Sequence, residues 1–154
     1  MKKINKRLIP KNRFKKIIQL VPICCADAII KKRNSFLLVK RGESPAKNKW
    51  WFLGGRVLFN ESLQSAVKRK LKEELNIKKI KQIKFLGVGE TRFKKGKFGK
   101  PAHTINNVFL VELEKKQADS IRTDKTISAY RWFEKISKNF HPYIKKSLKL
   151  AGFK

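Results

Sequence analysis

The sequence predicts a layered sandwich of helices and a mixed sheet, of the α/β or α+β class. Residues 61–75 place apolar side chains at helical spacing, and this helix lies between segments whose residues favour strands. A second helical pattern, at 140–151, follows the last strand-like segment. Strands combined with a central and a terminal helix are typical of such sandwiches.

The first part of the chain predicts a helix followed by a β-hairpin. Residues 10–19 have Pro10 in the first turn and apolar side chains on one face, which favours a short helix. Residues 20–31 are rich in valine, isoleucine and cysteine and predict a buried strand. Residues 35–40 predict the strand that pairs back with it across a tight turn.

The middle of the chain predicts a loop, a short strand and the central helix. Residues 41–49 are polar and contain a proline, so we expect a loop. We expect the next strand, 50–53, to stop at Gly54-Gly55. After the helix at 61–75, we expect three strands and a closing helix at 80–92, 104–114, 128–134 and 140–151.

The length of 154 residues suits one domain with one core. We expect a loose basic arm at 1–9 and a single domain at 10–154. The chain has no stretch of about 18 apolar residues, which predicts that no helix crosses a membrane. The basic residues near the N-terminus are not followed by the apolar segment of a signal peptide, so we expect a cytoplasmic protein.

The charge is unusual, because 40 lysine and arginine residues stand against 11 aspartate and glutamate residues, for a formal net charge of +29. A surface this basic attracts phosphates over long range. One interpretation is binding of nucleic acid or another polyanion. The other is a lysine bias of the whole proteome, as in some thermophiles and AT-rich genomes. The basic residues are spread along the chain without a nucleic-acid-binding motif, which favours the second interpretation.

The segment from Leu53 to Ile77 contains the residues that indicate chemistry. Gly55 follows a strand and has no side chain, so its backbone carbonyl can approach a ligand closely. The following helix carries Glu73 and Glu74, and Glu74 borders the apolar face of that helix. A partly buried acid is costly unless it is paired or binds a metal, and carboxylate oxygens suit magnesium. An acid pair on a helix is also common on solvated surfaces, so the pair alone leaves both interpretations open.

The spacing of this segment resembles the Nudix box, in which a glycine, a glutamate, an arginine and a pair of glutamates stand at fixed intervals. The matching residues are Gly55, Glu61, Arg69, Leu71, Glu73, Glu74 and Ile77. Lys70 departs from the usual box, which has a glutamate there, and Asn76 departs from the usual glycine. Asparagine tolerates the left-handed conformation that ends a helix. Lys70 lies one turn before Glu74, so we expect the two to pair and the site to hold a single metal.

The flanking residues resemble the GDP-mannose mannosyl hydrolase branch of the Nudix family, which also lacks the glutamate at the Lys70 position. The matching residues are Lys40, Arg41, Pro45, Ala46, 50–52, 54–57 and Glu61, with Asp27 in the first strand and Tyr130, Arg131 and Trp132 in the last. The resemblance covers about residues 10–135. It implies an α/β fold, the Nudix α/β/α sandwich with a mixed central sheet.

The resemblance also implies a function, the magnesium-dependent hydrolysis of a nucleoside diphosphate derivative such as the nucleotide sugar GDP-mannose. In this branch water attacks the sugar carbon and the nucleoside diphosphate leaves. Manganese is the alternative metal. The implied metal ligands are Gly55 (through its carbonyl), Glu74 and Glu73. The implied catalytic residues are Glu74, Glu73 and Arg69. The implied substrate-binding residues are Asp27, Arg41 and Arg56, with Arg69 either reaching the diphosphate or ordering the site.

The residue that activates water does not follow from the resemblance. The branch uses a glutamine-histidine pair as metal ligand and general base just before its last strand, and this chain has Thr126 and Ile127 there. Neither side chain can act as a base. His103 and Asp124 are the candidates for that role, although a structural histidine and a solvated loop acid are the more common interpretations.

Two other functions are consistent with the sequence. The first is a Nudix pyrophosphohydrolase that attacks phosphorus, on ADP-ribose, a nucleoside triphosphate or a capped RNA end, with Glu73 or Glu74 assisting the water. The second is a non-catalytic Nudix-fold protein that uses its charge to bind RNA. The branch also implies a homodimer, by analogy alone.

Overall fold

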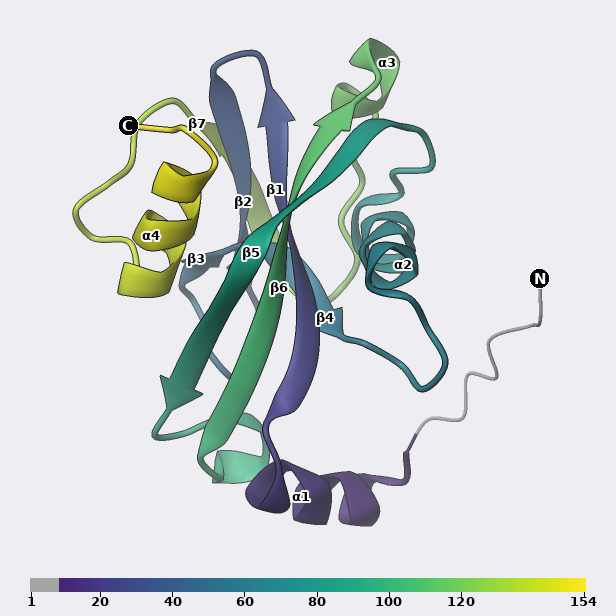
Figure 1. Cartoon of the computed structure of the whole chain (residues 1–154), viewed down its shortest axis with the longest axis vertical. Helices are drawn as coiled ribbons and strands as arrows, with labels where there is room; N and C mark the ends of the chain where they lie inside the picture. The colour runs from purple at the N-terminus through teal and green to yellow at the C-terminus, as the bar shows by residue number, and fades with distance from the viewer. Residues whose placement is uncertain (1–8) are drawn as a thin grey trace.

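The computed structural model describes residues 9–154, with only the backbone of Lys115. The basic arm expected at 1–9 therefore lies almost entirely outside the described residues. The described chain forms a seven-stranded sheet with helices on both faces (Figure 1). Within residues 9–154, no helix combines the length and the apolar character that crossing a bilayer requires.

The elements follow the predicted order. The strands are β1 (Ile23–Lys32), β2 (Ser35–Arg41), β3 (Trp50–Trp51), β4 (Leu53–Arg56), β5 (Ile80–Phe93), β6 (Ala102–Leu113) and β7 (Ile127–Phe133). The helices are α1 (Lys11–Leu20), α2 (Leu63–Leu75), the 3-10 turn η1 (Lys97–Gly99), α3 (Lys115–Ala118) and α4 (Pro142–Leu150). The short helices η1 and α3 were not predicted, because three or four residues carry too little periodicity to stand out from a loop.

Strand β1 is the middle strand of the order β3-β2-β1-β6-β5, and it pairs with three other strands. It runs parallel to β6 and antiparallel to β2 and β4. Strand β6 pairs with β5 at one edge, and β2 pairs with β3 and β7 toward the other. These directions confirm the predicted mixed sheet.

The sheet is buried on both faces by the helices that the sequence predicted. Helix α2 buries Ala66, Val67, Leu71 and Leu75 against one face. Helix α4 buries Tyr143, Ile144 and Leu148 against the other. Figure 1 shows α2 and α4 on opposite sides of the sheet. Each fully buried leucine contributes about 2 kcal/mol of transfer free energy, so these apolar faces fix the α/β/α arrangement.

Helix α2 carries the box residues, and its two ends are defined by specific contacts. The hydroxyl of Ser62 accepts a hydrogen bond from the backbone N–H of Ser65 at 3.1 Å, which satisfies one donor of the first turn. Asn76 ends the helix in the left-handed conformation, with φ of 55°. The expected tolerance of asparagine at this position is confirmed.

The predicted strand end at Gly54-Gly55 is wrong. Strand β4 runs through both glycines to Arg56 and pairs with β1, with Gly54 opposite Asp27. A Cβ atom on Gly54 would overlap the Asp27 carboxylate and would lie 2.6 Å from the backbone oxygen of Ala26. Gly54 is therefore required for the close approach of two strands, whereas the sequence alone predicts a strand end at the glycine pair.

Candidate active site

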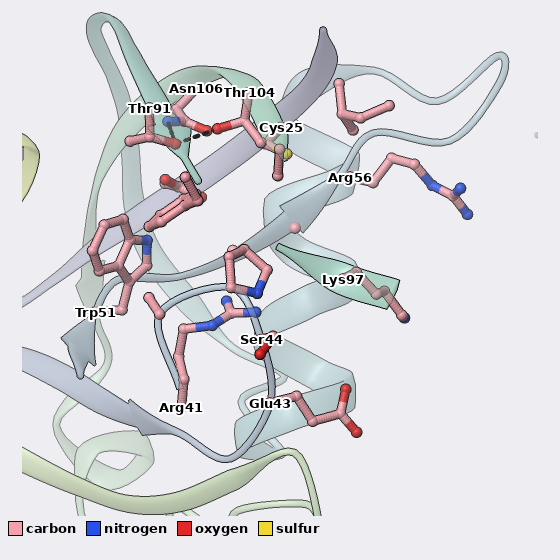
Figure 2. Close-up of a pocket in the computed structure, with 18 of the residues that line it drawn as sticks. Cys25, Arg41, Glu43, Ser44, Trp51, Arg56, Thr91, Lys97, Thr104 and Asn106 are labelled. Carbon is pink, nitrogen blue, oxygen red and sulfur yellow. Dashed lines mark hydrogen bonds between the residues drawn. The ribbon is translucent and has the colours of Figure 1, made fainter. Parts of the chain in front are cut away.

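A pocket of about 660 Å³ opens beside β1 and β4 (Figure 2). Helix α1, the loop after β2, helix α2 and the connection between β5 and β6 supply its remaining walls. Five of the seven predicted site residues line it, namely Asp27, Arg41, Gly55, Arg56 and Glu74. The other two, Arg69 and Glu73, do not line the pocket.

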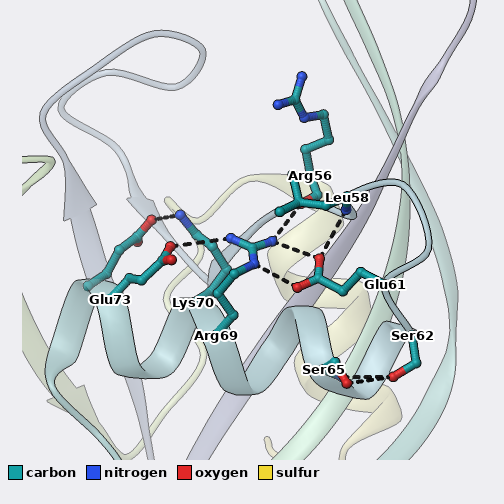
Figure 3. Close-up of polar contacts among 9 residues, drawn as sticks. Arg56, Leu58, Glu61, Ser62, Ser65, Arg69, Lys70 and Glu73 are labelled. Carbon is teal, nitrogen blue, oxygen red and sulfur yellow. Dashed lines mark hydrogen bonds and ion pairs between the residues drawn. The ribbon is translucent and has the colours of Figure 1, made fainter. Parts of the chain in front are cut away.

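Arg69 is the centre of a polar cluster behind the pocket wall (Figure 3). Its Nε donates to Glu61 Oε1 at 2.7 Å, and its Nη2 donates to Glu61 Oε2 at 3.0 Å. Nη2 also donates to the backbone oxygen of Arg56 at 3.0 Å, and Nη1 donates to Glu73 at 3.3 Å. All three guanidinium nitrogens are thus engaged by the protein, so the contacts favour the ordering role for Arg69 over contact with a diphosphate.

Glu61, a box residue to which the sequence assigned no role, is the main partner of Arg69. Its side chain is completely buried, and it also accepts a hydrogen bond from the backbone N–H of Leu58 at 3.0 Å. Burial raises the pKa of Glu61, but the hydrogen bonds from Arg69 and Leu58 outweigh that effect and hold the pKa below its ordinary value. The ionised pair therefore ties the loop between β4 and α2 to the helix.

Lys70 and Glu74 form the ion pair that the sequence predicted. Both side chains line the pocket and are mostly buried, at 19% and 14% exposed. The Lys70 side chain also lies against Gly55. A Cβ atom on Gly55 would be 3.0 Å from Lys70 Cε and 3.5 Å from Lys70 Nζ. The Lys70 side chain therefore lies against Gly55 and Glu74, two of the three residues that the resemblance implies as metal ligands.

Asp27 lies in the pocket wall, where it is almost completely buried. The hydroxyl of Tyr143, from helix α4, donates to Asp27 Oδ2 at 2.6 Å. Burial raises the pKa of Asp27 to about 6, although the Tyr143 hydrogen bond and the charge of Arg41 act in the opposite direction. The sequence did not indicate Tyr143, because it lies 116 residues away from Asp27 in the chain, on helix α4.

Two arginines bring positive charge to the pocket. Arg41 points into it from the end of β2 (Figure 2), and its Nε is buried with no hydrogen-bond partner among the described residues. Buried polar atoms are nearly always hydrogen-bonded, so this donor is available to an anionic ligand. The guanidinium of Arg56 lies over the ring of Phe14, 4.5 Å from its centroid.

Two aromatic side chains, Phe14 and Phe98, form a wall of the pocket that the sequence did not predict. Phe14 of α1 meets Phe98 of η1 edge to face, with ring centroids 6.3 Å apart, and both line the pocket. Phe98 adopts a left-handed backbone conformation, with φ of 61°, which is uncommon for a large side chain. The sequence showed only that Phe14 belongs to the apolar face of a helix. It gave no indication that η1 lies beside that helix.

The chain is similar to a known domain family and to several known proteins. The NUDIX domain model matches residues 24–140. A relative from Haloferax volcanii, the low-salt glycan biosynthesis protein Agl8, is 30% identical over 144 residues, which span 91% of this chain and 88% of that protein.

The chain belongs to the Nudix hydrolase family. Another relative, the ADP-ribose pyrophosphatase of Methanocaldococcus jannaschii, is 33% identical over 114 residues, which span 73% of this chain but only 64% of that protein. Among solved structures, the MutT NUDIX hydrolase from Burkholderia pseudomallei has a TM-score of 0.69 and 23% identity, over 84% of this chain and 98% of that one. This likeness confirms the Nudix α/β/α fold.

Nudix hydrolases generally use divalent metal ions, and the oxygen donors at the pocket are of the type that such ions prefer. Burial raises the pKa of Glu74, although the charge and hydrogen bond of Lys70 partly offset this rise. The Glu74 carboxylate therefore depends on a nearby cation to stay ionised. No group of three or more histidine, cysteine, aspartate or glutamate side chains converges in the described part of the chain. Of the metal ligands that the resemblance implies, Glu74 and Gly55 line the pocket and Glu73 does not.

Thr126 and Ile127 stand where the GDP-mannose mannosyl hydrolase branch has its metal ligand and general base. Both residues have structural roles in this Nudix protein. Ile127 is buried in the core beneath α2. Thr126 donates from its backbone N–H and its hydroxyl to Asp124 Oδ1, at 2.8 and 2.5 Å. Of the two candidate bases, Asp124 therefore already accepts two hydrogen bonds from Thr126 through its Oδ1 atom. The other candidate, His103, lines the pocket. Its Nε2 atom is 2.5 Å from the Oε1 atom of Glu90.

Replacing Arg69 by methionine leaves the buried carboxylate of Glu61 without its cation. We expect Arg69→Met to lower the free energy of unfolding by about 3 kcal/mol, because breaking a buried pair strands one charge. Arg69→Lys should recover only part of this loss, since an ammonium cannot form two parallel bonds. Urea denaturation measures both, with the exposed Arg122→Met as control. An Arg69→Met variant as stable as the control would show that the cluster does not anchor the loop.

The buried Asp27 predicts a specific pH dependence of stability. Its pKa rises from an ordinary 3.8 to about 6 in the folded protein, so the native state keeps a proton that the unfolded state has lost. The stability of the protein therefore falls as pH rises from about 4 to about 6. Asp27→Asn cannot titrate, so its stability relative to wild type should increase by up to about 3 kcal/mol over this range. Urea denaturation of both proteins at several pH values tests this. A stability difference between Asp27→Asn and wild type that stays constant with pH would contradict it.

Proposed function

We propose that this Nudix hydrolase cleaves a nucleoside diphosphate linked to a sugar, with magnesium held by Glu74 and the carbonyl of Gly55. The observation that carries the proposal is the pairing of charges around one pocket. Arg41 and Arg56 supply cations for a diphosphate, and Glu74 supplies a buried carboxylate for a metal. Diphosphates and divalent ions are bound together in this way because the metal needs both phosphate and carboxylate oxygens.

The arginines are proposed to bind the diphosphate. Arg41 has a buried Nε without a partner among the described residues, and a phosphate oxygen would satisfy it. Arg56 is held against Phe14, which limits the orientations of its guanidinium. The net charge of +29 also favours capture of an anionic substrate over long range.

The nucleoside and the sugar are proposed to occupy the remaining walls. The aromatic rings of Phe14 and Phe98 offer apolar surface to a base. Asp27 offers a carboxylate that accepts hydrogen bonds from sugar hydroxyls or from a base, and Tyr143 fixes its orientation. A volume of about 660 Å³ is in the range that holds a small-molecule ligand.

Magnesium bound at Glu74 would neutralise the charge that develops on the leaving group, with manganese as the alternative. The geometry favours Glu74 over Glu73 as the ligand, because Glu73 pairs with Arg69 and does not line the pocket. Glu73 is then part of the cluster that orders the box. In the same cluster, Arg69 donates a hydrogen bond to the backbone oxygen of Arg56, the residue that follows Gly55.

The relatives support a sugar-linked diphosphate. The Haloferax protein is named for glycan biosynthesis, and the Methanocaldococcus protein is named for ADP-ribose. ADP-ribose is itself a nucleoside diphosphate joined to a sugar. A nucleotide sugar such as GDP-mannose has the same general arrangement, a nucleoside diphosphate joined to a sugar, but a different base and a different sugar.

Attack at the sugar carbon, with the nucleoside diphosphate leaving, is the first candidate reaction. Attack at phosphorus is the second candidate, and a specific observation favours it. The branch that attacks carbon places its base where this chain has the buried Ile127, and the neighbouring Thr126 is bound to Asp124. Hydrolysis in ¹⁸O water separates the two, because the label enters the sugar in the first case and a phosphate product in the second.

A panel of nucleotide sugars, dinucleotides and nucleoside triphosphates assayed with magnesium tests the proposal. We expect hydrolysis of at least one nucleoside diphosphate sugar, and we expect Glu74→Gln to lower kcat/KM by at least about 100-fold, because it removes a metal ligand. The control is Glu134→Gln, an exposed acid after β7 that lies outside the pocket.

An active Glu74→Gln variant would show that the metal site is misplaced. A different result would show that the protein binds RNA and is not an enzyme. That result is no hydrolysis of any nucleotide together with RNA binding that weakens steeply with salt.

A further inference from the structure

We infer that Lys70 occupies the metal position when no metal is bound, so that a divalent ion reaches Glu74 only by displacing the Lys70 ammonium. The inference rests on the proposed metal site at Glu74 and Gly55. It adds that this chain carries its own cation at that site, because Lys70 stands where the usual Nudix box has a glutamate.

The Lys70 side chain lies against both residues of the proposed metal site. Its Nζ pairs with Glu74 Oε1, and its aliphatic stem packs over Gly55. Both partners belong to rigid elements, β4 and α2, that pack against each other. An ion bound to Glu74 and to the Gly55 carbonyl would therefore share a small space with the lysine side chain.

The neighbouring acids do not relieve this competition. Glu61 is completely buried in its pair with Arg69, and Glu73 also accepts a hydrogen bond from Arg69. Glu74 is the carboxylate of the box that lines the pocket. Lys70 and a divalent ion therefore compete for the same carboxylate, and like charges this close repel each other strongly.

Lys70 has two consequences for the site. Without metal, the ion pair with Lys70 holds the Glu74 carboxylate in place at the pocket wall, so the ligand is preorganised. With metal, the displaced ammonium remains on a flexible four-carbon stem beside the pocket, where a phosphate can accept from its three donors. Metal binding in the absence of nucleotide should then be weak, because the displaced ammonium lacks a partner.

Binding of Mn²⁺ alone, measured from the electron paramagnetic resonance signal of the free ion, tests the inference without any assay of activity. We expect Lys70→Met to bind Mn²⁺ about 10-fold to 100-fold more tightly than wild type. Lys70→Arg, which keeps the charge, should not gain affinity. Lys72→Met is the matched control, since it removes the same charge from an exposed position of α2 and should bind like wild type.

The outcomes separate this inference from the proposed function. Equal Mn²⁺ affinity for Lys70→Met and wild type, with weaker binding by Glu74→Gln, would overturn the role of Lys70 and leave the metal site in place. Binding that Glu74→Gln does not weaken, or no binding by any variant, would overturn the metal site itself. If Lys70→Met does not fold, Lys70→Gln serves instead, because its amide can still donate to Glu74 without a charge.

Discussion

The buried ion pair between Arg69 and Glu61 is the interaction on which the rest of the site depends. Its two parallel hydrogen bonds hold the loop between β4 and α2, and a third bond holds the backbone oxygen of Arg56. Gly55 and Arg56 are thereby fixed against the helix that carries Lys70 and Glu74. The pair acts mainly by fixing the positions of these residues, because a buried ion pair adds little net stability. Loss of one partner leaves the other charge buried without a counter-ion.

The electrostatics of the site reflect a chain with few acids. Each of the acids of the box has a cation of the protein as its partner, with Arg69 serving Glu61 and Glu73, and Lys70 serving Glu74. The pocket beyond them presents the cations of Arg41 and Arg56. In our proposal, such a pocket binds a polyphosphate without rearrangement, whereas a metal would compete with Lys70 for the Glu74 carboxylate. Substrate and metal would then be bound together, each lowering the repulsion that the other meets.

The sequence predicted those features that depend on local pattern. The apolar spacing predicted α2, and Asn76 was expected in the left-handed conformation that ends the helix. The resemblance of the box and of its flanking residues indicated seven site residues, and five of them line one pocket. Features that depend on distant partners were not predictable. The local sequence predicts a strand end at Gly54, because the residues around it do not indicate that the Asp27 carboxylate lies opposite in the sheet. Tyr143 and Phe98 gain their positions only when α4 and η1 pack beside elements far away in the chain.

Anomalous diffraction from crystals grown with Mn²⁺ and a nucleoside diphosphate would test the central claim most directly. We expect one Mn²⁺ peak within direct coordination distance of both the Glu74 carboxylate and the Gly55 carbonyl, with the Lys70 ammonium moved away from Glu74 toward the diphosphate. A peak at any other set of residues, or a peak at Glu74 with the Lys70–Glu74 pair intact, would contradict this arrangement.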